Sequence, residues 1–385
     1  MIPDGWVATQ IGDLAKFVSG GTPSKKNTKF WGGGEPWVSG KDLKDHYLEK
    51  SIDTLTEEGF HVAKKAPEGS SLILVRGMTL LKDFPVGYAS REVAFNQDLK
   101  ALIPAKHVDG LFLSFMLVEN KRKILQLVST AGHGTGRLDS NLIKSYPVNL
   151  PPLDEQRRIA QILFSWDKAI TTTEKILVNT RQQKKALMQQ LLTGKKRLLD
   201  ESGERFSGTW KRVELGDLLN YKQPTPYLVK STEYDCSYRT PVLTAGKTFI
   251  LGFTGEDFGV FSEGLPAIIF DDFTTDSKFV DFPFKAKSSA MKILTAKDGV
   301  SIKYVFEAMQ MIDFAVGGHQ RHWISIFSRL AIPLPSREEQ QKIAAVLSTV
   351  DQEVTALEQK LDALKQEKKA LMQQLLTGKR RVKIS

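Results

Sequence analysis

The chain has 385 residues, of which 41% are hydrophobic and 25% charged, so it is long enough for two or three cores of ordinary domain size. Its formal net charge of +10 favours an anionic partner, most commonly nucleic acid for a soluble chain. Cys236 is the only cysteine, which excludes an internal disulfide and a cysteine-based metal cluster. The N-terminus lacks a secretion signal and no run of about 18 apolar residues occurs, so we expect a cytoplasmic protein.

Residues 1–149 are predicted to form a first globular domain. Short β-prone runs such as Ser71–Val75 are separated by frequent glycine and proline. This pattern predicts a mixed α/β domain with a curved, mainly antiparallel sheet.

Within that domain, residues 19–37 combine glycines, cations, short polar side chains and aromatics. Cations of such a loop can neutralise phosphates, and its short polar groups can contact base edges. The predicted DNA contacts here are Ser24, Lys25, Lys26, Asn27, Thr28 and Lys29, together with Lys41 farther along. The alternative is a solvated basic loop with Trp31 and Trp37 in the core, and for Trp37 we favour the core.

Two further candidates lie later in the same domain. The glycine-rich segment 132–136 leads into Arg137, and arginine is suited to bidentate contacts with guanine or phosphate. Asn96 and Gln97 could contact adenine. The alternatives are that Arg137 fixes the domain to a helix and that the amides close a turn. With the glycine-rich segment we include His133 and Thr135 as DNA-binding candidates.

Residues 150–195 are predicted to form a long helix. The segment begins after prolines with Asp154 and Glu155 in its first turn, and it ends near Gly194 and basic residues. About 40 residues at 1.5 Å each give a rod of roughly 60 Å, which suits a spacer.

Residues 196–333 should contain a linker and a second mixed α/β domain, with β-prone runs such as Pro266–Phe270. Trp210 begins it as Trp6 begins the first domain. Arg321 aligns with Arg137, and Ser288 and Ser289 align with the Asn96–Gln97 pair. The predicted DNA contacts of this domain are Ser288, Ser289, His319, Gln320, Arg321 and His322.

Residues 334–385 repeat the long helix and end in a basic tail. The segment from Leu150 to Ala160 is echoed from Leu334 to Ala344, an offset of 184 (334 − 150), and Lys184–Lys195 returns unchanged as Lys368–Lys379. Apolar residues of both helices follow heptad spacing, so we expect the helices to pair with each other. The alternative is that each is a surface helix docked on its own domain. The predicted seam consists of Ile159, Leu163, Trp166, Ile170, Leu177, Leu187 and Leu191 in the first helix, and of Ile343, Leu347, Val350, Val354, Leu357, Leu361, Leu364, Leu371 and Leu375 in the second.

The predicted fold is therefore α+β, with two tandem mixed α/β domains separated and joined by two long antiparallel coiled-coil helices. This organisation resembles the specificity subunit of type I restriction-modification systems. The resemblance rests on the Glu-Gln segments from Leu150 and Leu334, the two Leu-Leu-Thr-Gly ends, and the Gly21 to Trp37 pattern, which the second domain lacks.

The resemblance implies that each domain recognises one half of a bipartite, asymmetric target in double-stranded DNA, and that the helices set the gap. It also implies two modification subunits, which bind S-adenosylmethionine and methylate adenine, and restriction subunits that join them. We expect this chain itself to bind no cofactor or metal and to be non-catalytic.

Two other functions are compatible with parts of the sequence. Asp271 and Asp272 could serve a metal-dependent nuclease, but a solvated acidic turn is the better interpretation because the first half has no equivalent. The chain could also be a coiled-coil protein scaffold without DNA specificity, although its basic charge argues against this. Salt-sensitive binding to duplex DNA would distinguish the two.

Overall fold

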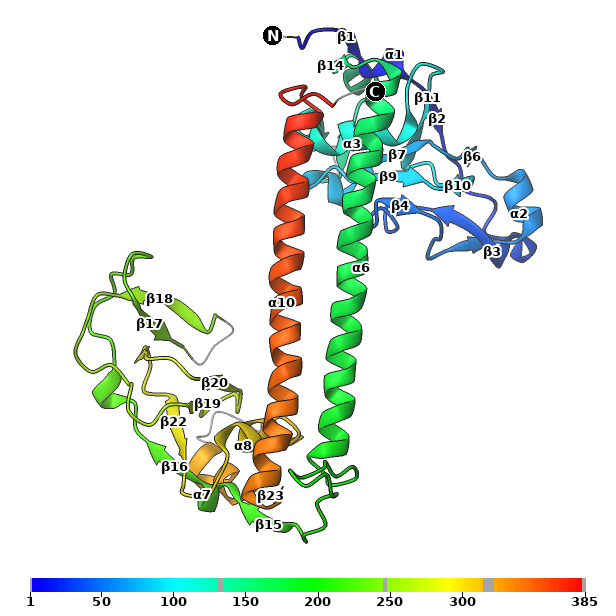
Figure 1. The fold of residues 1–385 in the computed structure, drawn as a ribbon. Coiled ribbons are helices and arrows are strands. Elements are labelled where there is room, and N and C mark those ends of the chain that lie inside the picture. Colours follow the sequence, from blue (N-terminus) through cyan, green and yellow to red (C-terminus); the bar gives the residue numbers. More distant parts are fainter. Residues whose placement is uncertain (1, 131–133, 245–247, 314–321, 383–385) are drawn as a thin grey trace. The chain divides into compact units, whose positions relative to one another are not determined.

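The computed structural model describes residues 2–130, 134–244, 248–313 and 322–382. It divides into two compact units: unit 1 contains Met1–Thr173 and Lys360–Ser385, and unit 2 contains Glu174–Gln359. Two helices of 39 residues, α6 (Leu153–Leu191) and α10 (Arg337–Leu375), contribute to both units (Figure 1). Each unit therefore combines a mixed α/β domain with parts of both helices.

The two long helices pack antiparallel. Within unit 2, Arg181 of α6 pairs with Glu358 of α10, and Lys184, which follows it on α6, pairs with Asp351, which precedes Glu358 on α10. This confirms the predicted fold class, in which two mixed α/β domains accompany an antiparallel helix pair. Among the described residues, no helix is long and apolar enough to cross a membrane.

Unit 1 contains two main sheets. The larger has the strand order β2-β11-β7-β9-β4, and its central strands β11 and β7 are antiparallel. The smaller has the order β5-β3-β10-β6, in which β3 and β10 are parallel. A third sheet, β12-β13-β8, lies beside them, and β1 pairs with β14 where the domain meets the start of α6.

The elements of unit 1 that precede α6 are short, as frequent glycine and proline in the sequence predict. They are β1 (Val7–Gln10), α1 (Ile11–Leu14), β2 (Ala15–Ser19), η1 (Thr28–Phe30), β3 (Trp31–Val38), β4 (Tyr47–Leu48), β5 (Thr54–Leu55), α2 (Glu57–Val62), β6 (Lys65–Ala66), β7 (Ser71–Leu74), β8 (Arg76–Gly77), η2 (Met78–Leu81), β9 (Val86–Ala89), β10 (Val93–Phe95), β11 (Leu99–Pro104), α3 (Gly110–Glu119), α4 (Lys121–Leu125), β12 (Val128–Thr130), β13 (Gly136–Leu138), α5 (Ser140–Lys144) and β14 (Pro147–Leu150).

The core of unit 1 lies between the larger sheet and α3. Every residue of β7 is buried, as expected for a central strand covered on both faces. Helix α3 is apolar around most of its circumference and buries Phe112–Leu117 against β7, β9 and β11. Asp109 caps this helix by accepting a hydrogen bond from the backbone N of Phe112.

Unit 2 repeats this plan with fewer strands. Its sheets have the orders β16-β22-β19-β20 and β18-β17-β21, and β15 pairs with β23 where β1 pairs with β14 in unit 1. As in unit 1, the smaller sheet contains one parallel pair, here β17 and β21. The elements are β15 (Lys211–Glu214), α7 (Leu215–Leu218), β16 (Leu219–Lys222), η3 (Thr225–Tyr227), β17 (Thr240–Leu243), β18 (Ile250–Thr254), β19 (Ala267–Asp271), β20 (Ser277–Val280), β21 (Lys285–Ala286), β22 (Met291–Ala296), α8 (Ile302–Met309), α9 (His322–Ser325), η4 (Phe327–Arg329) and β23 (Ala331–Leu334).

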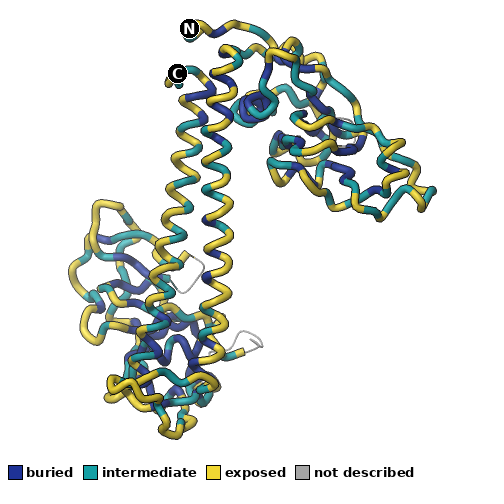
Figure 2. The backbone as a smooth tube through the Cα atoms, turned by 45° about the vertical axis from the view of Figure 1, so that its right-hand side comes forward, coloured by how far each residue is buried: buried dark blue, intermediate teal, exposed yellow. Residues whose placement is uncertain are grey.

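The ends of the long helices also belong to the domain cores. In unit 1, Ile159 and Leu163 of α6 and Leu375 of α10 join the core of the larger sheet. In unit 2, Leu191 of α6 and Leu347 of α10 join the corresponding core. The predicted seam residues are all buried or half-buried, whereas much of the remaining helix surface is exposed (Figure 2). Helix pairing and helix docking, which the sequence presents as alternatives, therefore occur together.

A tryptophan, a glutamate and an arginine fasten the start of each long helix. In unit 1, the buried Glu155 accepts hydrogen bonds from the indole of Trp6 and from the guanidinium of Arg381. In unit 2, Glu339 accepts the same bonds from Trp210 and from Arg197. The repeated sequence segments thus form the same Trp-Glu-Arg contact in both units.

The glutamine that follows each of these glutamates ties the helix to the first residues of a domain helix. The side-chain oxygen of Gln156 accepts from the backbone N of Asp109, the cap of α3. The side-chain oxygen of Gln340 accepts from the backbone N of Ser301, the cap of α8. The Glu-Gln pair therefore connects each long helix both to the start of its domain and to the first residue of a domain helix.

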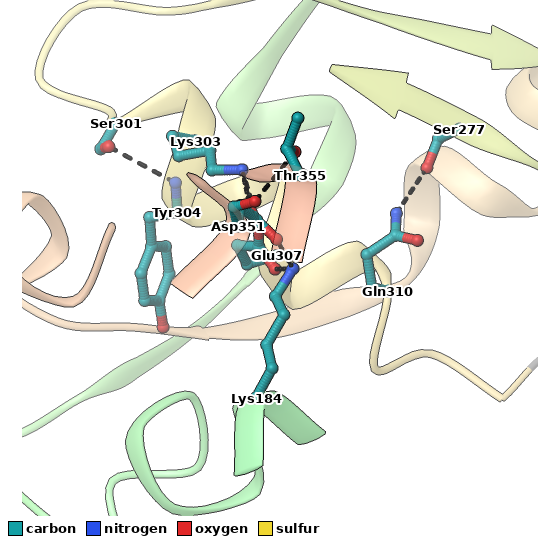
Figure 3. A network of polar contacts seen from close by, with 9 residues as sticks. All are labelled: Lys184, Ser277, Ser301, Lys303, Tyr304, Glu307, Gln310, Asp351 and Thr355. Carbon is teal, nitrogen blue, oxygen red and sulfur yellow. Dashed lines mark hydrogen bonds and ion pairs between the residues drawn. The ribbon is translucent and has the colours of Figure 1, made fainter. Parts of the chain in front are cut away.

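In unit 2 an ionic network lies where α8 meets both long helices (Figure 3). Its Lys184–Asp351 pair has an equivalent in unit 1, where Lys368 pairs with Asp167. Lys303 and Glu307 of α8 join Lys184 of α6 and Asp351 of α10, with N···O distances of 2.6 to 3.0 Å. Glu307 is fully buried, and its contacts are ion pairs without well-aligned hydrogen bonds. Hydrogen bonds from the two lysines hold the pKa of Asp351 below its usual value, although burial acts in the opposite direction.

Candidate nucleic-acid interface

The basic loop between β2 and β3 is built on a tryptophan pair. Trp31 and Trp37 meet edge to face with ring centroids 5.0 Å apart, and the ammonium of Lys25 lies 5.7 Å from the Trp31 ring. The Trp31 indole donates to the backbone O of Ser24, and the Trp37 indole donates to the backbone O of Gly21. Trp37 is buried, as favoured from the sequence, and the pair holds the loop on the small sheet.

The remaining predicted contacts of this loop lie on its surface. Lys25, Lys26, Lys29, Ser24 and Thr28 are exposed, and the described residues contain no carboxylate within ion-pair distance of the three lysines. Asn27 is half-buried, and its side-chain oxygen accepts from the backbone N of Lys29, so it caps the short helix η1. The loop therefore presents three lysines that have no carboxylate partner among the described residues, on a backbone that the tryptophan pair holds.

Asn96 and Gln97 lie next to this loop but differ in environment. Asn96 is buried and exchanges hydrogen bonds with Asp98, so its amide closes the turn between β10 and β11, which was the alternative interpretation. Gln97 is exposed, and its side-chain oxygen accepts a bond of 2.5 Å from the hydroxyl of Thr22. Gln97 thereby links the basic loop to this turn.

A cleft of about 630 Å³ opens beside the Asn96 turn. Lys41 and Lys44 line it from the loop after β3, and Arg76 lines it from β8. Asp42 fixes the lysine loop, because its carboxylate accepts from the backbone N of Ser39 and of Ile52. Cations from two separate parts of the sequence therefore meet at one cleft, which Asp83 and Asp98 also line.

Arg137 extends this basic surface. It pairs with Arg76 in the antiparallel register of β13 and β8, and both side chains are exposed. Neither arginine has an ion-pair partner among the described residues. Thr135 is half-buried just before β13, and His133 lies outside the described residues.

Arg76 and Lys44 line the cleft but were not predicted from the sequence. Arg76 comes two residues after the buried strand Ser71–Leu74, and a cation at the end of a buried strand was a usable signal. Its partner Arg137 is distant in sequence, however, and only strand pairing brings the two together. Lys44 carries no comparable signal.

Only part of the predicted DNA contacts of unit 2 lies within the described residues. Ser288 and Ser289 are exposed in the turn before β22, where the hydroxyl of Ser288 accepts from the backbone N of Ala290. His322 is buried at the start of α9, and its backbone N donates to the backbone O of Asp272. His319, Gln320 and Arg321 lie outside the described residues.

Asp271 and Asp272 have structural partners. The Asp271 carboxylate accepts from the backbone N of Phe273, and the Asp272 carboxylate accepts from the backbone N of Trp323 and pairs with the buried Lys292 at 3.5 Å. The two carboxylates are buried rather than solvated, which corrects that part of the expectation from sequence, whereas Phe273 and Thr274 of the same turn are exposed. In the part of the chain that the structure describes, no three His, Cys, Asp or Glu side chains are grouped to hold a metal ion.

Comparison with known families identifies the fold. The model of the type I restriction modification DNA specificity domain matches residues 3–180 and 207–366. The chain belongs to this family. The resemblance drawn from the repeated Glu-Gln and Leu-Leu-Thr-Gly segments is thus confirmed, and each match takes in one domain and part of a long helix.

Individual members of the type I specificity family show different degrees of similarity. A specificity subunit of a type I restriction enzyme from Escherichia coli is 48% identical over 143 residues, which cover 36% of this chain and 35% of that protein, so the match spans about a third of its length. A specificity subunit from Methanocaldococcus jannaschii is 23% identical, with 99% of this chain and 94% of that protein covered. The crystal structure of a type I S subunit from M. genitalium has a TM-score of 0.72 at 15% identity over the whole of both chains, which supports the fold.

Proposed function

We propose that this chain is the DNA-recognition subunit of a type I restriction-modification complex and that it recognises a bipartite, asymmetric target. Residues 1–149 would form the first target-recognition domain, and residues 196–333 would supply a linker and the second. Residues 150–195 and 334–385 would form the helices that set the gap between the half-sites. The observation that carries this proposal is that one domain plan occurs twice in a chain of the specificity family.

In the first domain, Lys25, Lys26, Lys29 and Lys41 would neutralise phosphates of the duplex, because all four are exposed. Arg137, which is exposed, would contact a guanine edge or a phosphate. Ser24 and Thr28 on the basic loop, and Gln97 beside it, supply short polar groups for base edges. In the second domain, Ser288 and Ser289 would take part in the corresponding contacts.

The partners follow from the same assignment. Two modification subunits, which would bind S-adenosylmethionine and methylate adenine, assemble on this chain, and restriction subunits join them. The chain itself would hold no cofactor. Ile176 and Val178 are exposed apolar residues on α6, and such a surface suits contact with another protein.

Methylation mapping tests this proposal. The chain is expressed with the modification subunit encoded beside it, and N6-methyladenine is mapped across the cellular DNA. We expect a two-part motif with a fixed gap. If the complex assembles and no such motif appears, the chain is instead a protein scaffold or a DNA-binding protein that does not direct methylation.

A further inference from the structure

The connection that follows β7 carries apolar side chains on an anchored turn. Met78 and Leu81 of η2 are 63% and 42% exposed, whereas Leu80 between them is buried. Gly136 of β13 lies so close to this turn that a Cβ atom there would come within 2.7 Å of the Leu80 Cβ. The turn is therefore held in place against β13 while Met78 and Leu81 face solvent side by side.

The same connection carries more cations than acids. Arg76 precedes the turn and Lys82 follows it, and Arg137 faces Arg76 across the strand pair. The one acid of the connection, Asp83, pairs with Lys121. Like charges directly opposite each other destabilise a strand pair, and no described carboxylate compensates these two arginines. An anion bound between them would remove this cost.

An apolar side chain flanked by unpaired arginines fits duplex DNA. Arginines can hold the phosphates, while an apolar side chain inserts between two base pairs and partly unstacks them. The cleft adjoins the same turn, and the cations that line it, Lys41, Lys44 and Arg76, outnumber the carboxylates of Asp83 and Asp98 in its lining. The charge pattern therefore favours DNA over an apolar protein partner.

Unit 2 carries a related feature at the equivalent place. The connection after β19, which corresponds to β7, presents Phe273 with 40% of its surface exposed. This turn is also anchored, because the carboxylate of Asp271 accepts hydrogen bonds from the backbone N of Phe273 and of Thr274. An exposed apolar residue on a fixed turn thus occurs in both domains.

We infer that Met78 is a wedge that opens one base-pair step of the first half-site, with Arg76 and Arg137 holding the neighbouring phosphates. This inference rests on the proposed function and adds to it that the domain deforms the DNA it recognises. Because unstacking lowers the cost of rotating a base out of the duplex, the wedge would assist a modification subunit that needs an extrahelical base.

The test uses the full-length chain in complex with its modification subunit and a duplex selected by that complex from a randomised pool. Met78→Ala should bind this duplex about tenfold more weakly, since it no longer offsets the cost of unstacking. Met78→Phe should bind like the wild type. Leu142→Ala, at another exposed apolar residue of unit 1, is the matched control and should have no effect.

A second readout separates a wedge from an ordinary surface contact. A series of duplexes, each with one mismatched base pair in the first half-site, should contain one that restores the affinity of Met78→Ala to within about twofold of the wild type. 2-Aminopurine placed at that step should fluoresce more with the wild-type complex than with Met78→Ala.

Three other outcomes would contradict the wedge or the proposed function. Unchanged binding by Met78→Ala, or weakened binding that no mismatch restores, overturns the wedge while the proposed function stands. Loss of assembly with the modification subunit, at unchanged DNA affinity, would make the turn a protein interface and also overturn it. A wild-type complex that selects no duplex removes the proposed function itself.

Discussion

The guanidinium of Arg381 holds the carboxylate of Glu155 through two hydrogen bonds, of 2.7 and 2.8 Å, across 226 residues of sequence. Such a bidentate pair is directional as well as ionic. Glu155→Gln keeps an acceptor for Trp6 but removes the charge, and we expect the melting temperature of unit 1 to fall by about 2–4 °C, the effect of roughly 1 kcal/mol in a domain of this size. Glu339→Gln should lower the melting temperature of unit 2 instead. Differential scanning calorimetry with separate transitions checks this, and an equal shift of both transitions by either variant would contradict it.

The ionic network around Glu307 predicts that the stability of unit 2 depends strongly on the lysines that pair with this carboxylate. Lys303→Met leaves the buried Glu307 with Lys184 alone, and we expect unit 2 to lose about 3 kcal/mol of unfolding free energy. Lys303→Met combined with Glu307→Leu should lose less, because no buried charge is left without its partner. Denaturant titration measures both. A double variant that is less stable than the single one would contradict this account.

His46 predicts how the stability of unit 1 depends on pH. Burial lowers the pKa of His46 to about 4 from 6.5, with nearby Asp167 raising it and Lys368 lowering it. The unfolded chain therefore binds more protons at this residue between pH 6.5 and 4, so stability is complete above pH 6.5 and declines as the pH falls toward 4. The decline should amount to roughly 2–3 kcal/mol.

The matched variants for this pH effect are His46→Gln and His61→Gln, since His61 is exposed. Denaturation of unit 1 at pH 7 and at pH 4.5 should show a smaller difference in His46→Gln than in the wild type. If His46→Gln and His61→Gln behave alike, the pH dependence has another origin.

The basic loop predicts how strongly DNA affinity depends on salt concentration. Each phosphate that the protein no longer neutralises should reduce the slope of log K against log salt by about 0.9, so replacing Lys25, Lys26 and Lys29 by Ala should reduce it by about 3 if each lysine binds one phosphate. A control with three exposed lysines outside the loop and the cleft, Lys16, Lys106 and Lys123, should retain the slope. Fluorescence anisotropy at several salt concentrations measures both. Equal slopes in the two triple variants would assign the loop a role other than DNA contact.

The long helices predict a change in target geometry. Inserting one heptad into both α6 and α10 keeps the seam in register and should lengthen the gap in the methylated motif without changing either half-site. The mapped motif of the variant is the measurement. A gap of unchanged length would mean that the helices do not determine it.

The repeated parts of the chain could be predicted from sequence, whereas the contact surface could be predicted only in part. Glu155 and Glu339 lie in segments that repeat at one offset. Each accepts a hydrogen bond from a tryptophan at the start of its domain, so the repeated sequence corresponds to a repeated contact. The basic loop was predicted because residues 19–37 combine glycines, cations, short polar side chains and aromatics in one local stretch. Arg76 was missed because its meaning depends on the pairing of β8 with β13, and such long-range pairing leaves little trace in local composition.

The side chains of Leu371, Met372, Leu375 and Leu376 at the end of α10 complete the core that begins with Trp6 and Ile11. During synthesis, these leucines and Arg381 leave the ribosome more than two hundred residues after Glu155. Until then the nascent first domain exposes an apolar face and a carboxylate that has no cation. The part of the protein that is translated first is thus the part whose folding is finished last, and a cell that makes this chain has to protect that face from aggregation for most of the time of translation.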